Sequence, residues 1–114
     1  MIDPKLLRGS LDTIILKLLD ERDEMYGYEI TQEVKEITGD QIKITEGALY
    51  PALHRLESKG ILSVEVRKAG NRMRKYYSLT PSGKTEVDQQ LLAMQDFIQS
   101  IQLIMNSKLA KSSL

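Results

Sequence analysis

Basic and aromatic side chains, the types that contact nucleic acid, are concentrated in the middle of this chain of 114 residues. Between positions 55 and 75, seven basic side chains stand against two acidic ones, whereas residues 1–44 hold six basic and ten acidic side chains. Guanidinium, ammonium, imidazole and phenol groups donate hydrogen bonds to phosphates and base edges. The net charge is zero, but basic and acidic side chains are concentrated in different parts of the chain. This separation predicts a DNA-binding face on an otherwise neutral protein. The alternative is a basic hairpin that only keeps a sheet edge soluble.

Residues for other kinds of chemistry are sparse. The chain has no cysteine and one histidine, His54, which excludes thiolate nucleophiles, disulfides and zinc–thiolate sites. The acidic side chains at 20–24 lack the ligand spacing of a calcium loop. No nucleophile–base pair or glycine-rich phosphate loop is recognisable. We therefore expect a protein that is not an enzyme and that holds no metal and no cofactor.

The segment 45–60, TEGALYPALHRLESKG, is predicted to be a helix that carries part of the DNA-binding face. Its apolar residues recur at the spacing of one helix face, Thr45 can cap its start and Gly60 can end it. Pro51 leaves two interpretations open, either an irregular first turn or a regular helix that begins at Pro51. In both, three hydrogen-bond donors face solvent: Tyr50, His54 and Arg55.

Two helices are expected before this one. Residues 10–20 and 26–38 each carry an apolar stripe at helical spacing. The first nine residues form either a short arm or an extra helical turn, and residues 40–44 are β-branched enough for a minor edge strand. Two helices joined by a short turn and preceded by a packing helix have the helix-turn-helix layout. The predicted buried face of the second helix consists of Ile30, Val34 and Ile37.

After Gly60 the apolar period changes from helical to alternating. This change predicts strands at 62–67 and 74–79, joined by a turn with Gly70-Asn71 at its centre. The tip of this hairpin is basic on both arms. Three helices followed by such a hairpin predict a winged helix-turn-helix domain over residues 1–80. The fold class is mainly α with a small β-hairpin (α+β).

Thr80-Pro81 is a strong helix start, and the helix can continue to about Ser107. A seven-residue apolar repeat along it favours a partner helix, so we expect a homodimer. The alternative is a helix folded back on its own subunit. Residues 81–114 are thus assigned to a dimerisation helix and a frayed tail. The predicted seam consists of Val87, Leu91, Met94, Ile98, Ile101 and Met105.

Three motifs resemble those of PadR-type transcriptional regulators: MYGYEI at 25–30, GALYPALHRLESKGIL at 47–62 and RKYYSLTPSGK at 74–84. The single C-terminal helix is similar to that of the shorter PadR subgroup. The resemblance implies a homodimeric winged-helix repressor that binds inverted repeats in double-stranded DNA. It also implies release of the DNA, as in many members, when a small, often aromatic, ligand binds near the C-terminal helices or the dimer interface. Because the chain lacks the tryptophan that lines such a site in some members, we expect a softer apolar pocket formed by Met94, Phe97 and Met105.

The predicted mechanism places the helix at 45–60 in the major groove and the hairpin on the adjacent minor groove or backbone. An arginine–guanine pair is the most informative contact available to it. For each tyrosine, and for His54, a packed or solvated side chain without DNA contact is the alternative. The predicted DNA-contacting residues are Tyr28, Thr45, Gly47, Tyr50, His54, Arg55, Lys68, Asn71, Arg72, Arg74 and Lys75, with Tyr26 as an alternative to Tyr28.

The apolar runs are too short to span a bilayer, and the first ten residues lack the apolar core of a signal peptide. We therefore expect a soluble, cytoplasmic protein without a membrane partner. The alternative function is a winged-helix protein–protein interaction module without its own operator.

Overall fold

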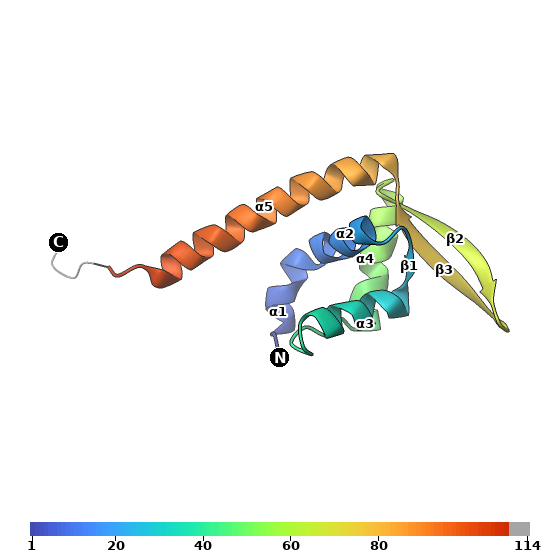
Figure 1. Ribbon diagram of the computed structural model, residues 1–114, viewed down its shortest axis with the longest axis horizontal. Coiled ribbons are helices and arrows are strands. Elements are labelled where there is room, and N and C mark those ends of the chain that lie inside the picture. Colours follow the sequence, from blue (N-terminus) through green and yellow to red (C-terminus); the bar gives the residue numbers. More distant parts are fainter. Residues whose placement is uncertain (110–114) are drawn as a thin grey trace.

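The computed structural model describes residues 1–109, in which four α-helices and a 3-10 turn precede a β-hairpin and one long helix follows it (Figure 1). The first residues form an extra helical segment, α1 (Pro4–Leu7), and a 3-10 turn, η1 (Arg8–Ser10), so the arm interpretation is wrong. Helices α2 (Leu11–Glu21) and α3 (Gly27–Ile37) follow, as the sequence predicts. The predicted frayed tail lies mostly outside the described residues.

Helix α4 (Glu46–Ser58) resolves the two interpretations of Pro51. The Thr45 hydroxyl accepts a hydrogen bond from the Ala48 amide at 3.2 Å, and the Leu49 amide donates to the Thr45 carbonyl at 2.9 Å, so the first turn is regular. The helix continues through Pro51, which is exposed, at the loss of one backbone hydrogen bond. Gly60, with φ of 76°, follows its end.

The edge strand predicted at residues 40–44 is wrong. Asp40 has φ of 66°, and the Ile42 amide donates to the Thr38 hydroxyl at 3.0 Å, so turn contacts satisfy this backbone. The Gln41 carbonyl accepts from the Ile2 amide at 2.7 Å, which ties the segment to the N-terminus. The small edge strand is instead β1 (Met25–Tyr26), which joins the sheet ahead of α3.

Strands β2 (Leu62–Ala69) and β3 (Arg72–Leu79) form the predicted hairpin, and the antiparallel sheet has the order β1-β3-β2. The turn at Gly70-Asn71 is confirmed, with Gly70 at φ of 65°. Only the base of the hairpin is buried in the core: Leu62 is buried and Val66 is 52% exposed. The rest projects from the helices as a wing (Figure 1).

The hydrophobic core lies between α2, α3, α4 and the base of the sheet. Ile30 and Val34 are buried in it, as predicted. The prediction for Ile37 is wrong, because its side chain is 67% exposed at the rim of an apolar cleft under the long helix.

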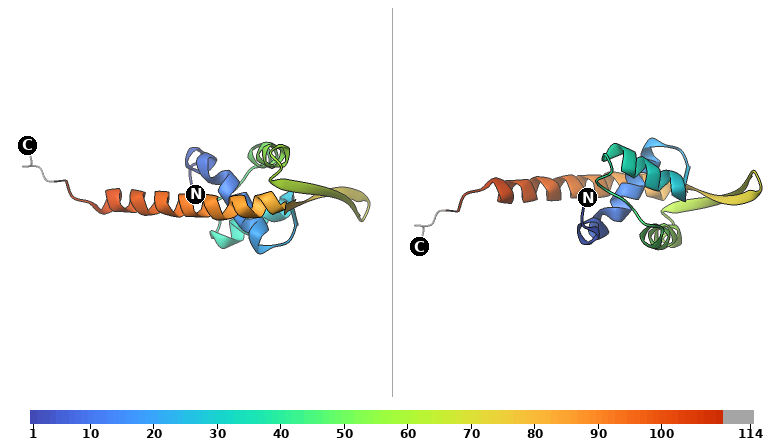
Figure 2. Two further views of the ribbon diagram at one scale, coloured as in Figure 1. Left: turned by 90° about the horizontal axis from the view of Figure 1, so that it is seen from above. Right: turned by 90° about the horizontal axis from the view of Figure 1, so that it is seen from below.

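The long helix, α5 (Pro81–Asn106), begins with the predicted Thr80 cap, whose hydroxyl accepts from the Gly83 amide at 3.0 Å. Its first turns pack on the body so closely that a Cβ on Gly83 would lie 2.2 Å from the Ile61 carbonyl oxygen. Farther along, α5 extends beyond the body (Figures 1 and 2). No helix within residues 1–109 is both long and apolar enough to cross a membrane.

Candidate nucleic-acid interface

The solvent face of α4 is a strip of residues at helical spacing, and a hollow lies on each side of it. The strip consists of Gly47, Pro51, His54 and Ser58, all exposed. On one side α4 faces the start of α3 and strand β3 across a hollow of about 640 Å³, the wing groove. On the other side it faces α1 and η1 across a hollow of about 470 Å³, the N-terminal cleft.

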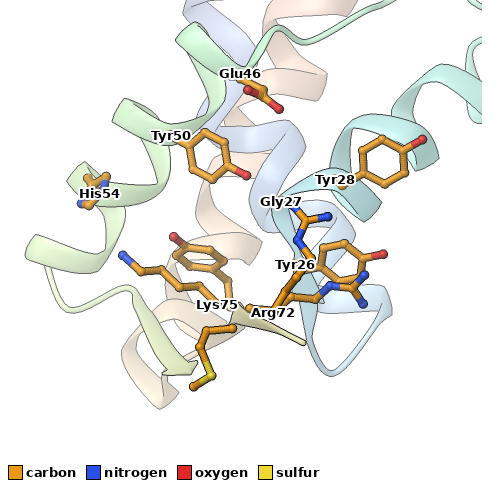
Figure 3. Close-up of a pocket in the computed structure, with 11 residues that line it drawn as sticks. Tyr26, Gly27, Tyr28, Glu46, Tyr50, His54, Arg72 and Lys75 are labelled. Atoms are coloured by element: carbon orange, nitrogen blue, oxygen red, sulfur yellow. The ribbon is translucent and has the colours of Figure 1, made fainter. Parts of the chain in front are cut away.

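The wing groove brings together six of the predicted DNA-contacting residues (Figure 3). Side chains of α4, of the start of α3 and of β3 line its walls, although α4 and β3 are separated in sequence by strand β2. Prediction from sequence did not assign Glu46, Met73 or Tyr77 to it. Tyr77 is buried, and this burial raises the pKa of its phenol. The six predicted residues are Tyr28, Tyr50, His54, Arg72, Arg74 and Lys75.

Helix α4 meets the start of α3 where Tyr50 lies over Gly27. A Cβ on Gly27 would be 2.6 Å from the Tyr50 hydroxyl oxygen, so the Tyr50 ring fits here because residue 27 has no side chain. The Tyr26 amide donates to the Glu29 carboxylate at 3.1 Å, which satisfies a free N–H at the helix start. Tyr28, one residue into the helix, is 61% exposed.

Two arginines that pair in register in the outer half of the hairpin, Arg67 and Arg74, stack on tyrosine rings. The Arg67 guanidinium lies 3.9 Å from the Tyr76 ring centre and is paired with Glu24, and that of Arg74 lies 4.2 Å from the Tyr26 ring centre. A hydrogen bond with Tyr76 raises the pKa of Arg74. These contacts hold the wing against the segment before α3. Arg74 therefore packs within the protein as well as lining the groove.

The N-terminal cleft holds the other predicted residues of α4, namely Thr45, Gly47 and Arg55. The Arg55 guanidinium donates to the Asp12 carboxylate of α2 at 2.6 Å, so Arg55 lies apart from Tyr50 and His54. Two further cations line this cleft, Arg8 and Lys43, and the sequence prediction omitted both from the DNA-binding set. The only feature of the sequence that could have indicated a DNA contact is that Arg8 and Lys43 lie shortly before the starts of α2 and α4.

Lys68 and Asn71 lie near the hairpin tip, where Lys68 is paired in register with Met73 and Asn71 forms the turn. They line neither hollow.

The predicted seam along α5 divides into two parts. Val87 is fully buried in the core of the chain itself, so the prediction that it contacts a partner helix is wrong. Leu91 packs partly against the same core. Beyond it, the helix exposes a series of large apolar side chains: Phe97, Ile98, Ile101, Leu103, Ile104 and Met105.

An apolar cleft of about 250 Å³ separates the middle of α5 from α2 and α3. Met94 lines it, as do Leu91, Ile37 and Ile42. Phe97 and Met105, which the sequence prediction grouped with Met94, lie outside this cleft on the exposed half of α5. Within residues 1–109, no three His, Asp or Glu side chains are clustered as metal ligands.

Known proteins resemble this chain over most of its length. The model of the transcriptional regulator PadR-like family matches residues 15–89. A transcriptional regulator of Mycobacterium tuberculosis is 32% identical, over 69% of this chain and 71% of its own. The negative transcriptional regulator PadR of Bacillus subtilis is 32% identical, over 76% of this chain and 48% of its own. The solved structure of a transcriptional regulator from Clostridium thermocellum has a TM-score of 0.79 and 34% identity, covering 86% of this chain and 95% of that one.

Proposed function

Because this chain belongs to the PadR-like family of transcriptional regulators, we propose that it represses transcription by binding double-stranded DNA as a homodimer. The observation that carries this proposal is the wing groove, where the solvent face of α4 and the basic strand β3 converge. Repression is favoured by the similarity to a negative transcriptional regulator of Bacillus subtilis.

In the proposed complex α4 lies in the major groove, which admits an α-helix. The exposed strip of α4 carries small side chains at Gly47, Pro51 and Ser58, so the helix can approach the bases closely. His54 lies on the same strip and can donate to a base edge or a phosphate. The wing contributes phosphate or minor-groove contacts through Lys68, Asn71, Arg72, Arg74 and Lys75. Tyr28 and Tyr50, across the groove from the wing, can donate to phosphate.

The homodimer is supported by the exposed half of α5. Ile98 and Ile101 are 49% and 38% exposed, on the part of α5 that extends beyond the other helices and the sheet. A contiguous exposed apolar surface is typical of an interface. A second copy that packs against this half by twofold symmetry would present two α4 helices to an inverted repeat.

The apolar cleft beside Met94 supports a small apolar or aromatic effector. The cleft lies between α5 and helices α2 and α3 of the DNA-binding body. A ligand wedged there would change the angle between body and dimerisation helix, and with it the spacing of the two α4 helices. Phe97 and Met105 would join such a site only across the dimer.

Fluorescence anisotropy with DNA from upstream of the protein's own gene, and with scrambled DNA, tests the proposal. Both titrations are repeated over a salt series. Sequence-selective binding whose affinity falls steeply with salt is expected, because the contacts release counterions from phosphates. If that DNA is not the operator, selection from random sequences recovers one. No selective binding after selection would overturn the proposal and favour the protein–protein interaction module.

A further inference from the structure

We propose that the N-terminal cleft is a second DNA-backbone surface, in which Arg8 and Lys43 bind phosphates on the side of α4 opposite the wing. The inference rests on the proposed DNA binding. It adds two contact residues to that proposal, and it adds contact with the second strand of the DNA. Neither cation belongs to the three motifs that carry the family resemblance.

A helix with its side chains is about 10–12 Å wide and the major groove is about 12 Å wide, so an inserted helix has a phosphate backbone along each side. The wing can meet only the backbone on the side of Tyr50. The N-terminal cleft lies on the side of Ala48 and Arg55. Figure 2 shows α1 and α4 on the same side of α5, with the wing continuing beyond α4.

The N-terminal cleft is positively charged. It is lined by Arg8, Lys43 and Arg55, and Asp12, the carboxylate beside it, is already paired with Arg55 at 2.6 Å. Arg8 and Lys43 are exposed and form no ion pair within residues 1–109. Two cations that face a shared hollow without a carboxylate partner of their own suit an external anion.

The backbone holds both cations in place. Arg8 begins η1, next to Leu7, whose side chain is buried. Lys43 is followed by Ile44, which is buried in the core. The hydrogen bond from the Ile2 amide to the Gln41 carbonyl joins the two segments. The pair is therefore presented by anchored backbone, which lowers the entropic cost of binding.

Replacing both cations gives the first test, with the selected operator as the probe. In Arg8→Ala with Lys43→Ala, affinity should fall at least tenfold near 0.15 M salt, and the salt slope should fall by about 2 per bound protomer. The matched control is Lys5→Ala with Lys84→Ala, which removes the same charge from exposed positions outside the cleft. The control should lose far less affinity. Equal losses in the two double variants would overturn the inference.

Neutral methylphosphonate linkages, placed one at a time in each operator strand, give a second test that needs no change in the wild-type protein. Wild type should be sensitive to phosphates flanking the α4 footprint on both strands. Arg8→Ala with Lys43→Ala should lose sensitivity on one flank only, and Arg72→Ala on the other. Sensitivity confined to the wing flank in wild type would reject the cleft while leaving DNA binding intact. If the wild-type protein does not bind the unmodified operator at all, the proposed function is rejected instead.

Discussion

The Arg55 guanidinium donates a hydrogen bond to the Asp12 carboxylate at 2.6 Å, joining α4 to α2 across 43 positions of sequence. Both groups are partly exposed, with side-chain exposures of 49% and 29%. The pair gives Arg55 a fixed partner beside the N-terminal cleft, away from the wing groove. It also brings a carboxylate to the flank of α4 that we propose meets DNA.

Asp12→Asn should tighten operator binding several-fold. The substitution removes a carboxylate that repels phosphate and releases Arg55 to contact DNA. Stability should change by less than about 1 kcal/mol, because the pair is exposed to solvent. Anisotropy titrations and thermal melts measure the two effects. Asp20→Asn, with the same charge change at an exposed site on α2, should leave affinity nearly constant. Weaker binding by Asp12→Asn would show that the carboxylate orients Arg55 for its contact.

Gly27→Ala should weaken DNA binding with little loss of stability. The new methyl group displaces the outer end of the Tyr50 side chain, whereas the backbone of Gly27 does not have a positive φ and can therefore accept alanine. In a Tyr50→Ala background, Gly27→Ala should have no further effect on affinity. A double-mutant cycle measures this coupling. Additive losses of affinity would mean that Gly27 acts independently of Tyr50.

Substitution of Arg72 should affect DNA affinity, whereas substitution of Arg74 should also affect stability, although both are basic residues of β3. Arg72→Ala should lower affinity for all sequences and reduce the salt slope by about 1, with unchanged stability. Arg74→Lys keeps the charge but loses a planar group stacked on Tyr26, so it should lower the melting temperature of the protein. Thermal melts and a salt series separate the two. Identical behaviour of the two variants would contradict a packing role for Arg74.

Ile98→Glu combined with Ile101→Glu should produce monomers. Both side chains are exposed in the protomer, so the fold should survive, while carboxylates buried in a dimer interface are costly. We expect the dimer dissociation constant to rise at least about 100-fold. Light scattering measures the mass, and operator titration should show reduced affinity. Gln95→Glu with Gln99→Glu adds the same charge to exposed α5 positions and serves as the control. A dimer that persists in the isoleucine variant would place the interface elsewhere.

Helix starts, turns and strand periods were predictable because their determinants lie within a few residues of one another. Thr45 and Thr80 accept from amides three residues later, and Gly70 adopts the positive φ that the hairpin turn requires. Strand β1 was not predictable in this way, because its two residues form a strand only by pairing with β3. Ile37 and Val87 were misassigned for the same reason, since helical period identifies an apolar face but not what covers it.

The sequence by itself thus determined the order of the main helices and the hairpin, the Thr45 and Thr80 caps, the basic wing and the face of α4 that carries His54. Only the tertiary structure decided which of these groups share a surface. It placed Tyr50 and His54 opposite β3 and turned Arg55 toward Asp12. It also brought Arg8 and Lys43 to one cleft from separate elements. Such arrangements depend on how helix faces pack across long sequence separations, and local hydrogen bonding does not encode them.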